Sequence, residues 1–271
     1  MDKRPIGIFD SGLGGLCAVR EAQRLLPFED IIYFGDSGRV PYGSRSYETI
    51  KKYGRQDANF LKSKGVKIIL AACGTVSSVA MDYLKESFSD IPIIGVVEAA
   101  CEQAVKLSAQ TQNKNIGIIA TEATISKGAY EKKIAELDGD LKVYSRACPL
   151  FVPLVEGGHL GKDKITKLAA EHYLSEFRGL QLSSLILGCT HYPMIKAAIG
   201  EIVQTRLVDV GLCAIQKLSS ELLERNLENE LGKKGKLELY VSDKAPNFSR
   251  IASEFLGEPV SGVTEVEIEK Y

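Results

Sequence analysis

Short apolar runs, each followed by a turn and then by a longer segment with helical spacing, recur along the whole chain. Runs of this length that are bounded by glycine or polar residues are typical of strands buried on both faces of a parallel sheet. The chain is therefore expected to have an α/β fold with open parallel sheets. The expected strands lie at residues 5–9, 31–34, 66–71, 92–97, 116–120, 141–145, 185–187, 205–208 and 237–241.

Apolar residues three and four positions apart fill most of the segments between these strands and predict the helices. The polar stretch at 108–115 predicts a surface connection and a junction between two domains. The stretch 149–158 predicts a loop or short helix that carries one carboxylate, Glu156, among apolar residues. One expected helix ends near Leu26 and another ends near Phe88. The others span residues 47–64, 98–107, 163–177, 195–202 and 212–224, and the last runs from near Asn247 to residue 255.

Two of the expected strands lead into a cysteine. The run ending at Gly188 leads to Cys189 and His191, and the run at 68–72 leads to Cys73 and Thr75. Open α/β sheets bind their ligands at the carboxyl ends of the strands. A helix that begins at such a cysteine would favour the thiolate over the thiol. The pattern predicts two reactive thiols, the alternative for each being simple packing in the core.

Matched features occur in the same order in the two halves of the chain, at nearly constant separations. This repetition predicts two similar open-sheet α/β domains related by a pseudo-two-fold duplication, with the active site in the cleft between them. The tail most simply returns to the first domain, which would then comprise residues 1–97 and 209–271, while the second comprises 98–208. The matched pairs are Ile6 with Ile116, Asp36 with Glu156, and Cys73 with Cys189.

A glycine-rich turn follows the first expected strand. It resembles a dinucleotide-binding motif only superficially, because the position of the third glycine is occupied by Cys17. The glycines would let the backbone approach a small ligand, whose carboxylate the N–H groups at the helix start could hold. Asp10 and Ser11 lie at the tip of the strand and would face that ligand.

Two facing thiols suit the inversion of a carbon stereocentre by proton transfer, which needs a base on one face and an acid on the other. A free thiol has a pKa of about 8.5, and a helix N-terminus would lower it towards neutrality, where general base catalysis is efficient. Asp10 with Glu156, or Asp36, could hold or relay protons, and His191 could bond to Cys189 or act as a local acid. Hydroxyl groups for a carboxylate and an ammonium group are offered by Ser11, Thr75, Thr121 and Thr190.

Composition excludes several other classes of protein. The 271 residues are 45% hydrophobic and 25% charged, and the net charge of −1 gives no basic field for nucleic acid or an anionic membrane surface. No signal-like segment or membrane span is indicated, so the cysteines are expected to be reduced. No C-x-x-C pair suggests a zinc ribbon or a thioredoxin motif, and no metal site is expected. Buried packing is expected for Cys17, Cys101, Cys148 and Cys213, and surface positions for His159 and His172.

Five stretches together resemble glutamate racemases, within the aspartate/glutamate racemase superfamily. They lie at residues 6–15, 35–43, 71–75, 152–158 and 187–193, so the resemblance spans most of the chain. It implies a cofactor-independent amino-acid racemase that acts on the small molecules L- and D-glutamate. It also implies a cytoplasmic enzyme, commonly a homodimer, that supplies D-glutamate for bacterial peptidoglycan.

The same resemblance implies roles for individual residues. The family's catalytic cysteines correspond to Cys73 and Cys189. Its supporting acids correspond to Asp10, Glu156 and His191, with Asp36 a looser candidate. No lysine lies in a recognisable pyridoxal phosphate motif, so no cofactor is expected. Substrate contacts are expected from Asp10, Ser11, Tyr42, Gly43, Gly74, Thr75, Thr121, Thr190 and His191.

Position 74 departs from the family pattern. The family usually reads Cys-Asn-Thr where this chain reads Cys73-Gly74-Thr75, so the side-chain amide is missing and only the backbone N–H of Gly74 could contribute. The departure keeps two alternatives open beside glutamate racemisation. One is a racemase or isomerase for another acid, such as aspartate, and the other is a non-catalytic protein that binds an amino acid in a regulatory role.

Overall fold

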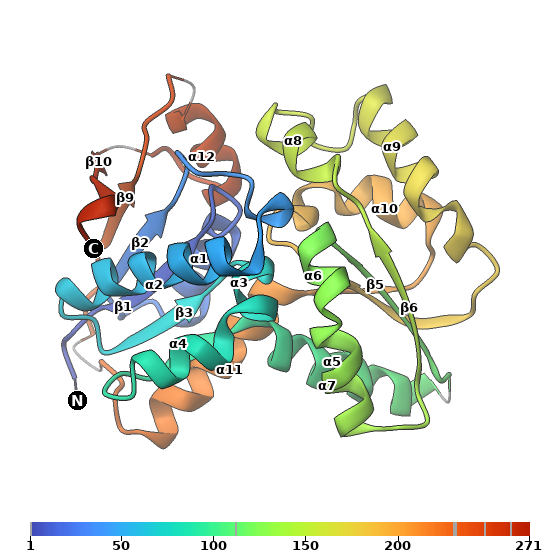
Figure 1. Ribbon diagram of the computed structural model, residues 1–271, viewed down its shortest axis with the longest axis horizontal. Coiled ribbons are helices and arrows are strands. Elements are labelled where there is room, and N and C mark those ends of the chain that lie inside the picture. Colours follow the sequence, from blue (N-terminus) through green and yellow to red (C-terminus); the bar gives the residue numbers. More distant parts are fainter. Residues whose placement is uncertain (1, 112, 230–231, 247, 261) are drawn as a thin grey trace.

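Two parallel sheets organise the molecule. The computed structural model describes residues 2–111, 113–229, 232–246, 248–260 and 262–271, and Figure 1 shows its two sheets side by side with helices around them. The first sheet contains β1 (Ile6–Asp10), β2 (Ile31–Gly35), β3 (Ile68–Ala71), β4 (Ile93–Gly95), β9 (Leu237–Val241) and β10 (Val263–Glu265). The second contains β5 (Asn115–Ala120), β6 (Lys142–Ala147), β7 (Leu182–Leu187) and β8 (Arg206–Asp209).

The order of the strands repeats between the sheets. The first sheet has the order β10-β9-β2-β1-β3-β4 and the second β6-β5-β7-β8, so the arrangement β2-β1-β3-β4 is matched by β6-β5-β7-β8. All of these neighbours are parallel. The expected fold, two similar open-sheet α/β units, is confirmed. We call the first sheet with its helices the first unit, and the second sheet with its helices the second unit.

The repeat places the two thiols at equivalent points. Cys73 lies two residues beyond β3, and Cys189 lies two residues beyond the matching strand, β7. The expected match of Asp36 with Glu156 is wrong. Asp36 directly follows β2, whereas the residue that directly follows the matching strand β6 is Cys148; Glu156 lies later, at the end of helix α8.

The helices surround the sheets as the apolar spacing predicts, with three differences. The helix after Cys73 is broken at Ala80 into α3 and α4, α5 begins at Val96 where a strand was expected to continue, and α6 and α7 were not expected. The helices are α1 (Leu16–Leu25), α2 (Tyr47–Ser63), α3 (Gly74–Val79), α4 (Met81–Ser87), α5 (Val96–Thr111), α6 (Glu122–Lys127), α7 (Ala129–Leu137), α8 (Phe151–Glu156), α9 (Lys164–Leu174), α10 (Lys196–Ile202), α11 (Val210–Glu224) and α12 (Phe248–Leu256).

Each difference has a local cause. The apolar run at 92–97 is divided between strand β4 and helix α5, because Val96 belongs to the buried face of α5 together with Ala99 and Ala100. The residue between α6 and α7 is Gly128, whose positive φ of 65° lets the chain turn between two short helices. The expected polar connection at 108–115 is helical up to Thr111, and Asn247 lies outside the described residues.

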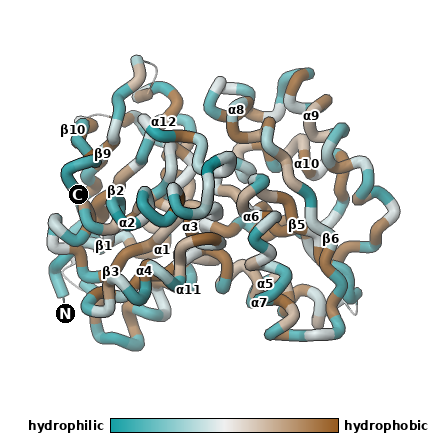
Figure 2. The backbone as a smooth tube through the Cα atoms, viewed as in Figure 1, coloured by the Kyte–Doolittle hydropathy of each residue, from teal (hydrophilic) through white to brown (hydrophobic). Residues whose placement is uncertain are grey.

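Apolar side chains from both units form a continuous core. Helix α5 packs against α11 and α7 and also contacts β7, so it joins the two units. The hydrophobic colour in Figure 2 follows buried strands such as β5. In the described part of the chain, no helix has the length and apolar character needed to cross a membrane.

A buried ion pair holds four segments together at the amino end of the first sheet. Lys67 Nζ lies 2.6 Å from Glu29 Oε2 and also donates to the carbonyl oxygens of Asp2 and Leu227, at 2.9 and 2.6 Å. The side chains of Lys67 and Glu29 are 0% and 4% exposed. Removal of the lysine would therefore leave a buried carboxylate without its counter-charge.

Lys67→Ala is expected to lower the free energy of unfolding by about 3–5 kcal/mol, the usual cost of breaking a buried pair from one side. Urea denaturation would measure the loss. The control is Lys62→Ala, which breaks the exposed pair with Asp90 and should cost less than about 1 kcal/mol. Equal losses for the two variants would contradict the assignment of the buried pair as a structural contact.

Candidate active site

Both cysteines line one small cavity between the carboxyl ends of the two sheets. Its volume is about 20 Å³. The residues expected in the site line it except Glu156, which bonds to His191 from outside the lining, and the looser candidate Asp36. Three further lining residues, Val40, Pro41 and Val152, were not expected as contacts, although the first two directly precede Tyr42 in the sequence. The lining residues are Asp10, Ser11, Val40, Pro41, Tyr42, Gly43, Cys73, Gly74, Thr75, Thr121, Val152, Cys189, Thr190 and His191.

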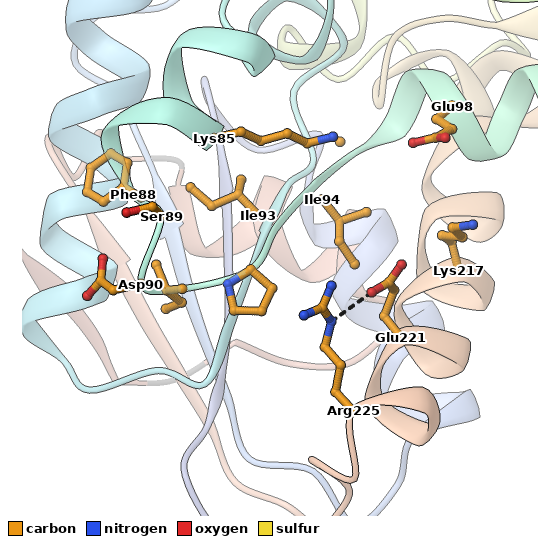
Figure 3. Close-up of a pocket in the computed structure, with 13 residues that line it drawn as sticks. Lys85, Phe88, Ser89, Asp90, Ile93, Ile94, Glu98, Lys217, Glu221 and Arg225 are labelled. Carbon is orange, nitrogen blue, oxygen red and sulfur yellow. Dashed lines mark hydrogen bonds and ion pairs between the residues drawn. The ribbon is translucent and has the colours of Figure 1, made fainter.

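Larger hollows lie elsewhere on the surface and lack this chemistry. One of these, about 500 Å³, lies beside β4 and α11. Arg225 Nε lies 2.9 Å from Glu221 Oε2 at its wall, and Figure 3 shows this pair. It contains no cysteine or histidine, so its size alone does not make it a candidate active site.

Cys73 is the residue that precedes helix α3. The residue is 4% exposed, and its thiol donates to Ser11 Oγ at 3.5 Å. Burial and, second, the negative charge of Asp10 together raise the pKa of the Cys73 thiol to about 12, against the bonds to Ser11 and the Val76 N–H. The expectation that a helix would lower this pKa is therefore wrong, because α3 is short and buried and its dipole does not offset the loss of solvent.

Cys189 has a histidine rather than a helix as its neighbour. A turn and a short 3₁₀ helix (Tyr192–Ile195) follow it, so the expected α-helix N-terminus is absent at this residue. Its Sγ atom lies 3.7 Å from Nδ1 of His191, whose Nε2 lies 3.0 Å from Glu156 Oε1. The three side chains form a hydrogen-bonded row that ends at the thiol.

The row changes the protonation of its histidine. Burial by itself would lower the pKa of His191, but the hydrogen bonds and negative charges of Cys189 and Glu156 raise it well above the usual value of about 6.5. A protonated His191 donates from both ring nitrogens, to the sulfur on one side and to the carboxylate on the other.

We expect NMR titration of the histidine ring nitrogens to show His191 still protonated above pH 6.5. The charged form stabilises the fold fully below that ordinary pKa, and this contribution is lost as the pH rises through the higher pKa of the folded state. Glu156→Gln should move the His191 titration to lower pH. A ring that titrates at or below 6.5 in the wild-type protein would contradict the assigned row.

Asp10 binds the glycine-rich turn and reaches the second unit. Its Oδ2 accepts the N–H groups of Gly15 and Gly12 at 3.0 and 3.3 Å, and its Oδ1 accepts the Thr190 hydroxyl at 3.4 Å. The expectation that these N–H groups hold a ligand carboxylate is therefore wrong, because Asp10 already occupies them. Burial raises the pKa of Asp10, against the charge of His191 and the N–H donors.

Hydroxyl groups meet across the cavity. Thr75, on α3 of the first unit, bonds to Thr121 of the second unit with 3.0 Å between their Oγ1 atoms. Thr121 also bonds to the hydroxyl of Thr124 at 2.9 Å and caps helix α6. Thr75 and Thr121 line the cavity, and their hydroxyl groups can each donate or accept a hydrogen bond, as a carboxylate or an ammonium group would require.

Asp36 does not line the cavity. It bonds to Tyr42 and, at 2.6 Å, to Arg39, and a second buried carboxylate, Asp57, bonds to the same two partners at 3.0 and 3.2 Å. Burial raises the pKa of Asp57 well above its usual range, and the negative charge of Asp36 adds to this. The network holds the loop that contains Tyr42 and Gly43, so it indicates a positioning role for Asp36 in place of the proton relay considered from the sequence.

The remaining cysteines and histidines lie as the sequence predicts. Cys17, Cys101, Cys148 and Cys213 are buried and free. His172 is exposed, and the His159 side chain is 40% exposed and faces Asp163. None of these lines the cavity.

Comparison with known proteins agrees with this geometry. The sequence pattern of the family described as Asp/Glu/hydantoin racemase matches residues 17–218. A glutamate racemase of Chlorobaculum tepidum is 43% identical over 93% of this chain and 92% of its own length. Glutamate racemase 2 of Caldanaerobacter subterraneus subsp. tengcongensis is 42% identical over the full length of both chains.

A solved structure matches the whole fold as well. The glutamate racemase of Francisella tularensis subsp. tularensis, crystallised in complex with D-glutamate, superposes with a TM-score of 0.92 at 40% identity and covers all of both chains. The similarity thus includes both sheets.

Proposed function

This chain belongs to the Asp/Glu/hydantoin racemase family, and we propose that it interconverts L- and D-glutamate with Cys73 and Cys189 as its two proton-transfer groups. The observation that carries the proposal is the placement of both thiols in one cavity, at equivalent strand ends of two matched units. Two opposed acid–base groups are what inversion of a stereocentre requires.

In the proposed reaction a thiolate takes the α-proton from one face of glutamate, so that the C–H bond breaks and an S–H bond forms. The opposite thiol then gives its proton to the other face of the carbon and is left as the thiolate. Cys189, beside a protonated His191, is the candidate for the resting thiolate, because a cationic donor stabilises a charged sulfur. Cys73, whose pKa is raised to about 12, is the candidate for the resting thiol.

The acids around the thiols would hold them in these states. His191 bonds to Cys189 and Glu156 bonds to His191. The negative charge of Asp10 raises the pKa of the Cys73 thiol. Substrate contacts are proposed from the hydroxyl groups of Ser11, Thr75, Thr121 and Thr190, with backbone contributions from Gly43 and Gly74. The hydroxyl of Tyr42 is already bonded to two carboxylates, so its contribution is to hold the loop.

The test is proton NMR of L-glutamate with the purified protein in heavy water, with reductant and no added cofactor. Loss of the α-proton signal together with the appearance of D-glutamate in a chiral assay is expected. L-Aspartate run in parallel tests the second candidate, which the glycine at position 74 motivates. Exchange of aspartate alone would replace the proposed substrate, and thermal stabilisation by glutamate without exchange would instead support a binding protein.

We also propose the domain division, the cellular location, the biological role and the oligomeric state. Strands β9 and β10 pair within the first sheet, which supports a division into residues 1–97 with 209–271 and residues 98–208. The dependence on reduced thiols supports a cytoplasmic location, and the product D-glutamate supports a role in peptidoglycan supply. A homodimer is proposed from the family resemblance, and sedimentation of the purified protein would test it.

A further inference from the structure

Gly74 lies where the two cysteine-bearing turns touch. A Cβ atom built on Gly74 would come within 3.0 Å of the backbone carbonyl oxygen of Gly188, closer than real Cβ atoms approach such an atom. On another wall of the cavity, a Cβ on Gly43 would lie 2.6 Å from the Cβ of Thr121. In both contacts the first unit supplies a glycine and the second unit supplies the atom that fills its place.

The second unit cannot relieve the contact at Gly74 by itself. The N–H of Gly188 donates to the Ile119 carbonyl at 2.7 Å, which fixes the turn to β5. A Cβ on Gly188 would lie 2.9 Å from the Cβ of Ala120, so the turn is closely packed against the second unit and has little space to move away from Gly74. A side chain at position 74 would therefore have to separate the two units.

The arrangement described is too closed to hold a glutamate molecule. A cavity of about 20 Å³ has room for about one water molecule. An amino acid between the thiols requires the units to separate, which breaks the bond between Thr75 and Thr121 and withdraws the Gly188 carbonyl from Gly74. A chain with a side chain at position 74 could not adopt this closed form, whereas the separated form would accommodate one.

We propose that Gly74 is a positioning residue that permits a closed, substrate-excluding form of the cleft, and that a side chain at this position shifts the protein towards the form that admits glutamate. The identity of the ligand rests on the proposed function, whereas the closure does not. Ligand affinity is reduced by the fraction of molecules that are not competent to bind. The family usually has an asparagine at position 74, and its side chain would oppose the closed form. The glycine of this chain permits that form.

The experiment measures how often the cleft opens, without turnover. Each cysteine is labelled with iodoacetamide, and its rate is followed by peptide mass spectrometry in the wild-type protein, in Gly74→Ala and in the matched control Gly200→Ala. A Cβ on Gly200, a half-buried residue of helix α10, has nothing within 4 Å. Gly74→Ala is expected to label Cys73 and Cys189 about tenfold faster and to bind D-glutamate about tenfold more tightly in calorimetry. The control should match wild type.

Cys101, fully buried in α5, separates opening of the cleft from loss of the fold. Unchanged labelling of Cys189 in Gly74→Ala overturns the inference, and so does an equal acceleration at Cys101. Gly43→Ala, at the other glycine contact, should accelerate the same two cysteines, and its failure to do so also overturns the inference. If labelling responds as expected but no α-proton exchange occurs in heavy water, the proposed function fails while the closure stands.

Discussion

Cys73→Ala and Cys189→Ala are each expected to lower kcat/KM for racemisation at least about a thousandfold, in both directions. General acid–base groups contribute about 10²–10⁴-fold each, and each variant removes one of the two thiols that line the cavity. The two cysteines come from separate units, so neither can replace the other without a rearrangement of the sheets. A chiral assay of glutamate, started from each enantiomer, would measure the loss.

Cys101→Ala is the matched control, since it removes a buried cysteine that does not line the cavity. Its activity per folded molecule should match wild type, even if some stability is lost. Circular dichroism would establish that all three variants are folded. Near wild-type racemisation by either cavity variant would rule out the two-thiol scheme.

The second large effect is expected from the row behind Cys189. His191→Asn and Glu156→Gln should each lower kcat/KM about a hundredfold or more, because the sulfur loses its charged donor or that donor loses its counter-charge. Enantiomers have equal free energies in water, so kcat/KM must fall by the same factor for L- and D-glutamate. The individual kcat values can differ between directions, since only one thiol adjoins the row.

His172→Asn provides the control for the histidine substitution, because His172 is exposed on α9 and outside the cavity. It should leave both kcat and KM unchanged. If His191→Asn retains activity close to that of this control, the row has no part in proton transfer. The titration of His191 described above distinguishes the two variants further, since Glu156→Gln keeps the ring and lowers its pKa.

The sequence predicts the strands and the cavity well because both depend on local patterns. Buried parallel strands appear as short apolar runs, and ligand sites follow from where such strands end. Helices α6 and α7 were missed because the residues 122–137 are rich in Lys and Glu and the buried positions are few: the buried side chains of α7 are Tyr130 and Ile134. Their weak apolar stripe does not stand out from a surface loop.

Other features depend on burial and on contacts between distant segments, which a linear pattern does not contain. The raised pKa of Cys73 is mainly a consequence of desolvation. The N–H groups of the glycine-rich turn are not free for a ligand, because the Asp10 carboxylate accepts hydrogen bonds from them. Asp57 occupies an ordinary position within α2 and becomes visible only through its bond to Tyr42. The false match of Asp36 with Glu156 shows that equal spacing in sequence does not establish equivalent positions in a sheet.

The interrupted first sheet has a consequence for the order in which the protein forms during synthesis. Strand β9 pairs with β2, yet it follows β2 by the whole of the second unit. The four strands of the second sheet lie in one continuous stretch, from Asn115 to Asp209, so that sheet can be complete while β2 still presents an open edge. Unpaired edges invite association with other chains. The nascent protein therefore carries an open edge at β2 from early translation until β9 leaves the ribosome.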